Sequence, residues 1–216
     1  EIKETVAYVP DDIYFFPQDN LKDMFNFYRR VYPEFNIERW EKIKPVFALD
    51  EKRPLRRFSR GMRKHAAFML SLSIMPDVLI LDEPMDGLDP VARRKVWNLI
   101  FQDVAERQTT VFVSSHNLRE LEDACDHVGI LHKGQVVLQR GLDELQNNIF
   151  KLQMGFHGDP PDFSFLNVLA DHRIGSVVQL VVRGEREQVL QQASALEPLM
   201  LDVLPLSLEE IFIYEL

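Results

Sequence analysis

Cysteine and long apolar runs are both scarce in this 216-residue sequence. The single cysteine, Cys125, excludes a disulfide within the chain and fits a reducing compartment. The longest mostly apolar stretch, residues 66–75, is about half as long as a membrane-spanning helix has to be, and no signal-peptide pattern opens the sequence. We therefore expect a cytoplasmic protein, which would work at a membrane only through a partner.

Positive charge is also in short supply. The sequence has 25 lysines and arginines against 34 acidic residues, which gives a formal net charge of −9. This balance argues against a protein that coats nucleic acid by bulk electrostatics, so any anion site has to be local. With 46% hydrophobic residues, the chain is able to bury a sizeable core.

Alternating strand and helix patterns in the middle of the sequence predict an α/β fold with a parallel sheet. Two short apolar runs bounded by helix breakers, at residues 77–82 and 109–114, are typical of parallel strands buried on both faces. The residues between and around them predict helices at 59–75, 90–107 and 117–125, and a hairpin at 128–138.

The flanking regions differ from this middle part. Residues 12–48 are rich in aromatics and show helical spacing at 21–31 and 37–47, so we expect a helical subdomain over about residues 12–75. The sequence after residue 148 predicts a small C-terminal α+β accessory domain, 149–216, attached to a main domain, 1–148. Its expected strands are 151–156, 168–172, 177–182 and 199–204, and its expected helices are 185–196 and one that begins at the capping box 207–210.

Two adjacent carboxylates, Asp82 and Glu83, follow the first buried strand. Open α/β sheets bind ligands at the carboxyl ends of their strands, and neighbouring carboxylates need a cation or a polarised water there. We expect Asp82 to hold Mg²⁺, through water, and Glu83 to align and deprotonate an attacking water. In the alternative, both side chains are solvated or cap the next helix.

Two further residues are expected at the same edge of the sheet. Asp89 precedes a helix whose first residue is proline, so an N-cap role is a sufficient explanation for it. His116 follows the second strand, where a lone histidine is more often structural than catalytic. The position of both near Asp82 and Glu83 favours a shared site.

A local excess of positive charge surrounds the start of the helix at residue 59. A phosphate site is expected there, made of backbone N–H groups, the Ser59 hydroxyl and Gly61, whose missing side chain would let an anion approach. The alternative is that Ser59 only caps the helix and that the basic residues pair with nearby acids such as Glu51. The basic residues are Lys52, Arg53, Arg56, Arg57, Arg60, Arg63 and Lys64.

These motifs, in this order, resemble the signature motif, Walker B, D-loop and H-loop of ATP-binding cassette (ABC) transporter ATPases. The resemblance covers roughly residues 1–148, and the C-terminal part resembles that of bacterial ABC-2-type exporters, within which the acetoin-utilisation-type subgroup is the most similar. The four matching motifs are Ser59-x-Gly61-Met62, Leu-Asp82-Glu83-Pro, Gly-Leu-Asp89-Pro and Ser-Ser-His116.

The resemblance implies a P-loop NTPase-like fold and an ATPase that uses ATP and Mg²⁺. It implies Glu83 and His116 as catalytic residues, Asp82 at the metal, and Ser59, Gly61, Asp89 and Asp11 at nucleotide. It also implies a head-to-tail dimer with a second ABC ATPase subunit, in which the signature motif of one cassette contacts the γ-phosphate bound to the other. The expected partner is a transmembrane permease subunit, with this chain placed peripherally at the inner face of the cell membrane. Export is the expected direction, and no nucleic acid is involved.

The sequence departs from the family pattern at three places. Phe58, Arg60 and Met62 replace residues of the usual Leu-Ser-Gly-Gly-Gln signature, and Asp11 stands where the Q-loop has glutamine. None of the nine glycines belongs to a G-x-x-x-x-G-K-[ST] loop, so the main grip on the β- and γ-phosphates is missing. The sequence opens on Glu1 and not on methionine, and residues 5–10 have the pattern of a strand that is already under way. We therefore expect an N-terminal truncation, and we expect these 216 residues alone to be inactive.

Three alternatives remain open at this point. The first is an ABC ATPase that serves translation or DNA repair instead of transport. The second is a regulatory or interaction module, which the missing phosphate loop favours. The third is a zinc site at Cys125, His127 and His132, for which the spacing is poor.

Overall fold

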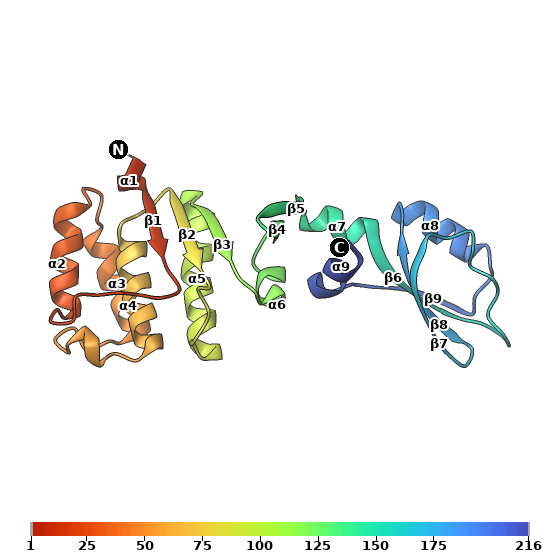
Figure 1. Cartoon of the computed structure of the whole chain (residues 1–216), viewed down its shortest axis with the longest axis horizontal. Helices are drawn as coiled ribbons and strands as arrows, with labels where there is room; N and C mark the ends of the chain where they lie inside the picture. Colours follow the sequence, from red (N-terminus) through yellow and green to blue (C-terminus); the bar gives the residue numbers. More distant parts are fainter. Residues whose placement is uncertain (1, 216) are drawn as a thin grey trace. The chain divides into compact units, whose positions relative to one another are not determined.

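The computed structural model describes residues 2–215 of the chain. The chain forms two compact units, 1–116 and 117–216. Figure 1 traces both units from the N-terminus in red to the C-terminus in blue. None of the helices within the described residues is long and apolar enough to cross a membrane.

A three-stranded parallel sheet in the order β1-β2-β3 forms the centre of the first unit. Helices precede, connect and flank these strands, as Figure 1 shows. The elements of this unit are α1 (Ile2–Thr5), β1 (Val6–Val9), α2 (Leu21–Val31), α3 (Ile37–Phe47), the 3-10 turn η1 (Leu55–Arg57), α4 (Arg60–Ser73), β2 (Val78–Asp82), α5 (Pro90–Arg107) and β3 (Thr110–Ser114). This arrangement confirms the predicted parallel α/β sheet.

The helix ends of this unit follow from short-range chemistry. Asn20 caps α2 in a reciprocal capping box with Asp23, and Asn36 accepts a hydrogen bond from the backbone N–H of Arg39 at the start of α3. The observed bounds of α2, α3 and α5 are those that the spacing predicts.

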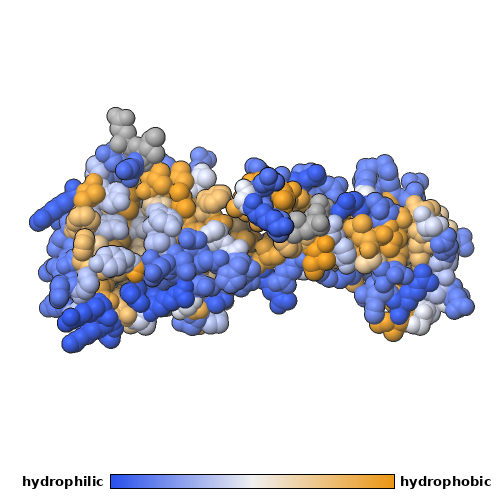
Figure 2. Space-filling view, viewed as in Figure 1, coloured by the Kyte–Doolittle hydropathy of each residue, from blue (hydrophilic) through white to orange (hydrophobic). Residues whose placement is uncertain are grey.

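The sheet buries one face only, which corrects the expectation of strands buried on both faces. Leu79 and Leu81 of β2 are buried, together with residues of α2 to α5, in one hydrophobic core. On the other face, Tyr8, Ile80 and Phe112 are paired neighbours across the three strands, and Tyr8 and Phe112 are 54% and 66% exposed. In Figure 2 apolar surface gathers over the β1–β3 region of this unit. The helices α2 to α5 therefore account for burial on one side of the sheet.

The second unit contains a β-hairpin and a four-stranded antiparallel sheet in the order β7-β8-β6-β9. Its elements are α6 (Leu118–Glu122), β4 (His127–His132), β5 (Gln135–Gly141), α7 (Leu142–Asn148), β6 (Ile149–Gly155), β7 (Val168–Ile174), β8 (Val177–Arg183), α8 (Arg186–Ser194), β9 (Met200–Leu204) and α9 (Leu208–Glu215). The predicted capping box is present, because Ser207 and Glu210 exchange backbone-to-side-chain hydrogen bonds at 3.0 and 3.2 Å.

The division between the units lies at 116/117, whereas the sequence predicts a boundary at 148/149. The reason is packing: Leu145 and Ile149 form a small core with residues of β8 and α9, and Val128 and Leu138 of the hairpin pack against it. The hairpin and α7, a helix that the sequence analysis does not predict, thus belong with the C-terminal unit. The helix predicted to reach Cys125 also ends earlier, at Glu122.

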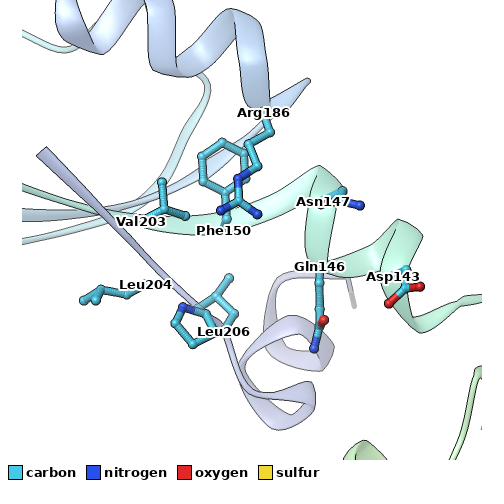
Figure 3. A pocket seen from close by; sticks show the side chains of 9 residues that line it. Asp143, Gln146, Asn147, Phe150, Arg186, Val203, Leu204 and Leu206 are labelled. Atoms are coloured by element: carbon cyan, nitrogen blue, oxygen red, sulfur yellow. The ribbon is translucent and has the colours of Figure 1, made fainter.

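A cavity of about 180 Å³ lies in the second unit, beside α7, β6 and β9. Figure 3 shows Arg186 at one wall, where its guanidinium lies 5.9 Å from the ring centroid of Phe150. This distance fits a cation–π contact. The arginine is therefore engaged with an aromatic side chain of its own unit.

Candidate functional site

The carboxyl ends of β2 and β3 bring the predicted acidic residues together. Asp82, the last residue of β2, is paired in register with Ser114, the last residue of β3. The Ser114 hydroxyl donates to Oδ1 of Asp82 at 2.6 Å, and the Tyr8 hydroxyl lies 3.5 Å from Oδ2. Asp82 is thus oriented by groups from both neighbouring strands, at the sheet edge where the sequence places it.

Glu83 leaves the strand in an unusual backbone conformation. Its φ angle is +44°, in the left-handed region that residues other than glycine seldom adopt. Its backbone N–H donates to the carbonyl oxygen of Ser114 at 2.9 Å. The chain turns sharply here, and the turn directs the Glu83 side chain toward the residues that follow β3.

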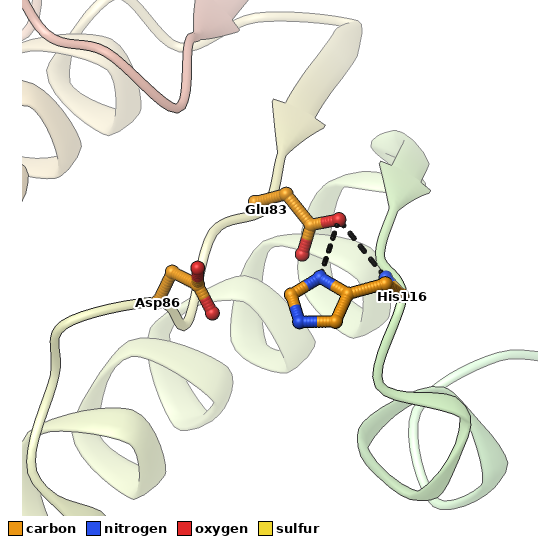
Figure 4. A group of neighbouring side chains, drawn as sticks. All are labelled: Glu83, Asp86 and His116. Carbon is orange, nitrogen blue, oxygen red and sulfur yellow. Dashed lines mark hydrogen bonds and ion pairs between the residues drawn. The ribbon is translucent and has the colours of Figure 1, made fainter.

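The Glu83 carboxylate is held by those residues, as Figure 4 shows. Oε1 accepts a hydrogen bond from the His116 backbone N–H at 2.9 Å and lies 2.9 Å from His116 Nδ1. Oε2 accepts from the Ser115 hydroxyl at 3.2 Å. The carboxylate is oriented by three groups while its side chain stays 23% exposed, so water has access to it. A fixed, accessible carboxylate is what a general base requires.

A third ligand-bearing residue, Asp86, lies in the same place and is absent from the sequence-based site. Carboxylate or imidazole atoms of Glu83, Asp86 and His116 all lie within 4.8 Å of one another (Figure 4). Asp82, the predicted metal residue, is outside this group. Asp86 stands three residues after Glu83 in the sequence, and this short spacing is the signal that could have drawn attention to it.

The donor atoms at this edge fit Mg²⁺ best at Asp82. Mg²⁺ prefers oxygen ligands and retains several waters, and Asp82 and Ser114 offer carboxylate and hydroxyl oxygens side by side. The group around Glu83 includes an imidazole nitrogen, which suits Mg²⁺ less well. Asp82 thus offers the more suitable oxygen ligands, and its role at Mg²⁺ and that of Glu83 as a base stay predictions.

Among the side chains that the structure describes, the one group of three or more that could hold a metal ion consists of Glu83, Asp86 and His116. The zinc alternative at Cys125, His127 and His132 is thus not supported. Within the described part of the chain, His127 faces Asp126 at 3.3 Å, and burial raises the pKa of the Cys125 thiol, which keeps it protonated.

The start of α4 shows the capping interpretation directly. The Ser59 hydroxyl accepts from the backbone N–H of Met62 at 3.2 Å. Packing favours glycine at position 61, because a Cβ there would lie 3.0 Å from the carbonyl oxygen of Gly87, a tight contact that would have to relax by a few tenths of an ångström. The group that lies close to Gly61 is thus a backbone carbonyl of the same chain. An anion contact at Ser59 and Gly61 stays a prediction.

Asp89 likewise has the N-cap role that the sequence analysis leaves open. It accepts from the backbone N–H groups of Val91 and Ala92 at 2.9 and 3.0 Å. These hydrogen bonds, led by that from Ala92, hold the pKa of the Asp89 carboxyl below its usual value. A contact of Asp89 with nucleotide stays a prediction.

Asp11 joins a network of cations that sequence reasoning does not foresee. Its Oδ1 lies 2.6 Å from an Arg60 guanidinium nitrogen and 3.4 Å from Lys64 Nζ. The hydrogen bond from Arg60 is the main cause that lowers the pKa of Asp11. Lys64 also donates to the backbone carbonyl of Glu83 at 2.6 Å. In the sequence Lys64 is one of the basic residues that precede the apolar run 66–75 of α4, and its closeness to this run is the one sequence signal for a buried position.

Comparison with known proteins places the chain in a family. A family model described as "AAA domain, putative AbiEii toxin, Type IV TA system" matches residues 5–122, which contain β1 to β3 and the site at their ends. The ABC transporter ATP-binding protein YtrB of Bacillus subtilis is 29% identical over 214 residues, or 99% of this chain. The chain belongs to the ATP-binding proteins of ABC transporters.

Two further comparisons agree with this family. The bacitracin transport ATP-binding protein BcrA of Bacillus licheniformis is 39% identical over 97 residues, which is 45% of this chain. A solved ATP-binding subunit of an ABC transporter matches 67% of the chain with a TM-score of 0.61 and 24% identity, which confirms the predicted fold. The ABC ATP-binding chain described here spans 73% of YtrB, 32% of BcrA and 62% of that solved subunit.

Proposed function

We propose that this chain is the ATP-binding subunit of an ABC transporter. In this role it couples binding and hydrolysis of Mg-ATP to the movement of a substrate, in the export direction, by a membrane permease. The observation that carries the proposal is the Glu83 carboxylate, oriented by Ser115 and His116 at the end of the parallel sheet. The transport function in the name of the relative BcrA supports the same role.

Each site residue then has a defined task. Asp82 would hold Mg²⁺, which neutralises charge on the phosphates. Glu83 takes the proton of the attacking water, and His116 holds the Glu83 carboxylate in place through its backbone N–H and Nδ1. All of these side chains lie in the first unit, so the α+β part is proposed as an accessory domain.

The proposal includes a head-to-tail pair of cassettes at the inner face of the membrane. Ser59 and Gly61 lie at the start of α4, whereas Glu83 follows β2. In the proposed dimer, Ser59 and Gly61 act on the nucleotide held by the second subunit. Arg60 and Lys64 already pair with Asp11 of the same chain, so the support comes from the other basic residues near Ser59, because positive charge at a helix N-terminus is favourable only when an anion is near. Asp89 and Asp11 are proposed to lie at nucleotide in the same dimer.

The test is Glu83→Gln in the assembled transporter, with Glu106→Gln as the control. Glutamine keeps the size and polarity of the side chain and removes the base, so ATP binding should persist while turnover falls about 10²–10⁴-fold. Glu106 is exposed on α5 and accepts a hydrogen bond only from its helix neighbour Gln102 among the contacts described. Its variant should keep wild-type turnover.

Unchanged turnover in Glu83→Gln would remove Glu83 from the proposed role. A transporter that moves substrate without any ATP turnover would favour the regulatory-module alternative, which the lack of a G-x-x-x-x-G-K-[ST] loop in these 216 residues supports.

A further inference from the structure

A fully buried lysine lies directly beneath the turn that carries Glu83. Lys64, in the second turn of α4, has no exposed surface. A buried ammonium group is costly unless it is paired and hydrogen-bonded. Its partners are therefore the key to its role, and they are the Glu83 carbonyl oxygen at 2.6 Å and Asp11 Oδ1 at 3.4 Å.

The backbone at Glu83 needs such a partner. Its left-handed φ of +44° is sparsely populated and persists only when the surroundings determine it. Pro84 follows, so the peptide group after Glu83 has no N–H with which to stabilise the turn. The N–H of Glu83 is bound to Ser114 and its C=O to Lys64. Together these two bonds determine where the Glu83 side chain begins.

The second partner of Lys64, Asp11, is one of two residues in this network that depart from the family pattern. Asp11 replaces the Q-loop glutamine and Arg60 replaces a signature glycine, and these two residues form an ion pair at 2.6 Å. Lys64 shares the same Asp11 oxygen. One carboxylate thus ties the segment after β1 to the start of α4 and to the lysine that holds Glu83.

We propose that Lys64 is a positioning residue for Glu83: its ammonium group fixes the Glu83 carbonyl, and Asp11 fixes the ammonium group. Lys64 does not touch nucleotide or water in this role. It acts through the backbone of the residue that does, so the functional part of the inference rests on the proposed role of Glu83. The structural part, in which the Lys64 ammonium group fixes the Glu83 carbonyl, does not depend on that role and can be tested without measuring ATP turnover.

The structural test is amide hydrogen exchange of the 216-residue chain. Lys64→Met keeps the aliphatic bulk and removes the donor, so exchange of the Glu83 amide should rise at least about tenfold, as expected for the loss of a hydrogen bond from a charged group. The amides of Ile80 and Leu81 in β2 should keep their protection. Arg94→Met, which removes a positive charge from the exposed surface of α5, is the matched control.

Asp11→Asn is a second variant for the case in which Lys64→Met does not fold. The Asp11 side chain is 39% exposed, so this change should be tolerated. It should raise Glu83 exchange in the same direction and by a smaller factor. Exchange at Glu83 equal to that of Arg94→Met in every folded variant would overturn the proposal.

The functional test is a double-mutant cycle in the assembled transporter. Lys64→Met should lower kcat by about 100-fold with KM for ATP unchanged, because a misplaced catalytic group loses rate and not substrate binding. In a Glu83→Gln background the same change should have no further effect, since both act through one group. A full additional loss in that background would show that Lys64 acts elsewhere and would overturn the proposal. If Glu83→Gln alone leaves turnover intact, it is the role of Glu83 that fails, and the exchange result still decides the contact.

Discussion

An ion pair between α3 and α5 provides a quantitative test of the fold. Arg39 of α3 donates to Asp103 Oδ1 at 2.7 Å and to Gln102 Oε1 at 3.2 Å. The two charged side chains are only 10% and 3% exposed. This pair connects α3 to α5, the helix that follows β2, so its removal tests how strongly these two helices are held together.

We expect Arg39→Met to destabilise the first unit by about 3–5 kcal/mol, because it leaves the Asp103 carboxylate buried without its cation. The double variant Arg39→Met/Asp103→Leu removes both charges and should return to within about 1 kcal/mol of the wild type or exceed it. Exposed Arg94→Met should change the stability by less than about 0.5 kcal/mol.

The pH dependence of the single variant has a defined sign. Burial is the main cause that raises the pKa of Asp103, and Arg39 opposes this shift. A carboxyl group whose pKa is raised on folding stabilises the fold below its unfolded pKa, and this contribution is lost as the pH rises through its folded pKa. The deficit of Arg39→Met should therefore be largest at neutral pH and shrink toward acid.

Urea unfolding followed by tryptophan fluorescence measures these differences. Both tryptophans, Trp40 and Trp97, lie in the first unit, so the signal reports that unit alone. A deficit below about 1 kcal/mol for Arg39→Met, or a double variant no more stable than the single one, would refute the reasoning about uncompensated buried charge.

Three further predictions concern nucleotide, partner and acid stability. The 216-residue chain should bind ATP weakly and show no Mg²⁺-dependent turnover in calorimetric titration, because its sequence contains no phosphate loop; micromolar binding with turnover would contradict this. Tyr14→Ser and Phe16→Ser should abolish assembly with the permease in co-purification and leave basal ATPase intact, since both side chains are exposed, at 77% and 56%; an unaltered complex would count against docking there. The hydrogen bond from Lys151 is the main cause that lowers the pKa of Glu210. The wild type should therefore be more stable at α9 than Glu210→Gln above the usual glutamate pKa and should lose this advantage as the pH falls below that value, as followed by circular dichroism. A stability difference that does not change with pH would exclude the Lys151–Glu210 pair as its cause.

Local signals in the sequence account for most of the helices. The bounds of α2, α3 and α5 depend on side-chain periodicity and on capping residues within a few positions, and the sequence contains both. Helix α7, with seven residues, is too short for a periodicity window. The unit boundary depends on Leu145 packing against residues about 60 positions later, which no local pattern reports.

The site is predictable to a similar extent. Topology brings Asp82, Glu83 and His116 to one edge of the sheet, and the order of strands in the sequence is enough to infer this. The link from Lys64 to Glu83 spans 19 residues and depends on the contact of the start of α4 with the residues that follow β2. It could not be derived from spacing, because Lys64 is one of seven basic residues near the start of α4, and such residues are normally placed on the solvent side.

Gly61 has a packing role that the sequence alone does not reveal. The sequence suggests a glycine that makes room for an anion, whereas the structure shows that it makes room for the carbonyl oxygen of Gly87 at the start of the loop to Asp89. The two reasons are compatible, since packing on this loop determines where the first backbone N–H groups of α4 point. Gly87 in turn has a φ of +74° and lies against the Arg60 side chain, which pairs with Asp11. Contacts of Gly61 with Gly87 and of Arg60 with Asp11 therefore determine the position of the start of α4 within its own chain. A nucleotide bound by a second subunit would contact a helix end whose position is already determined.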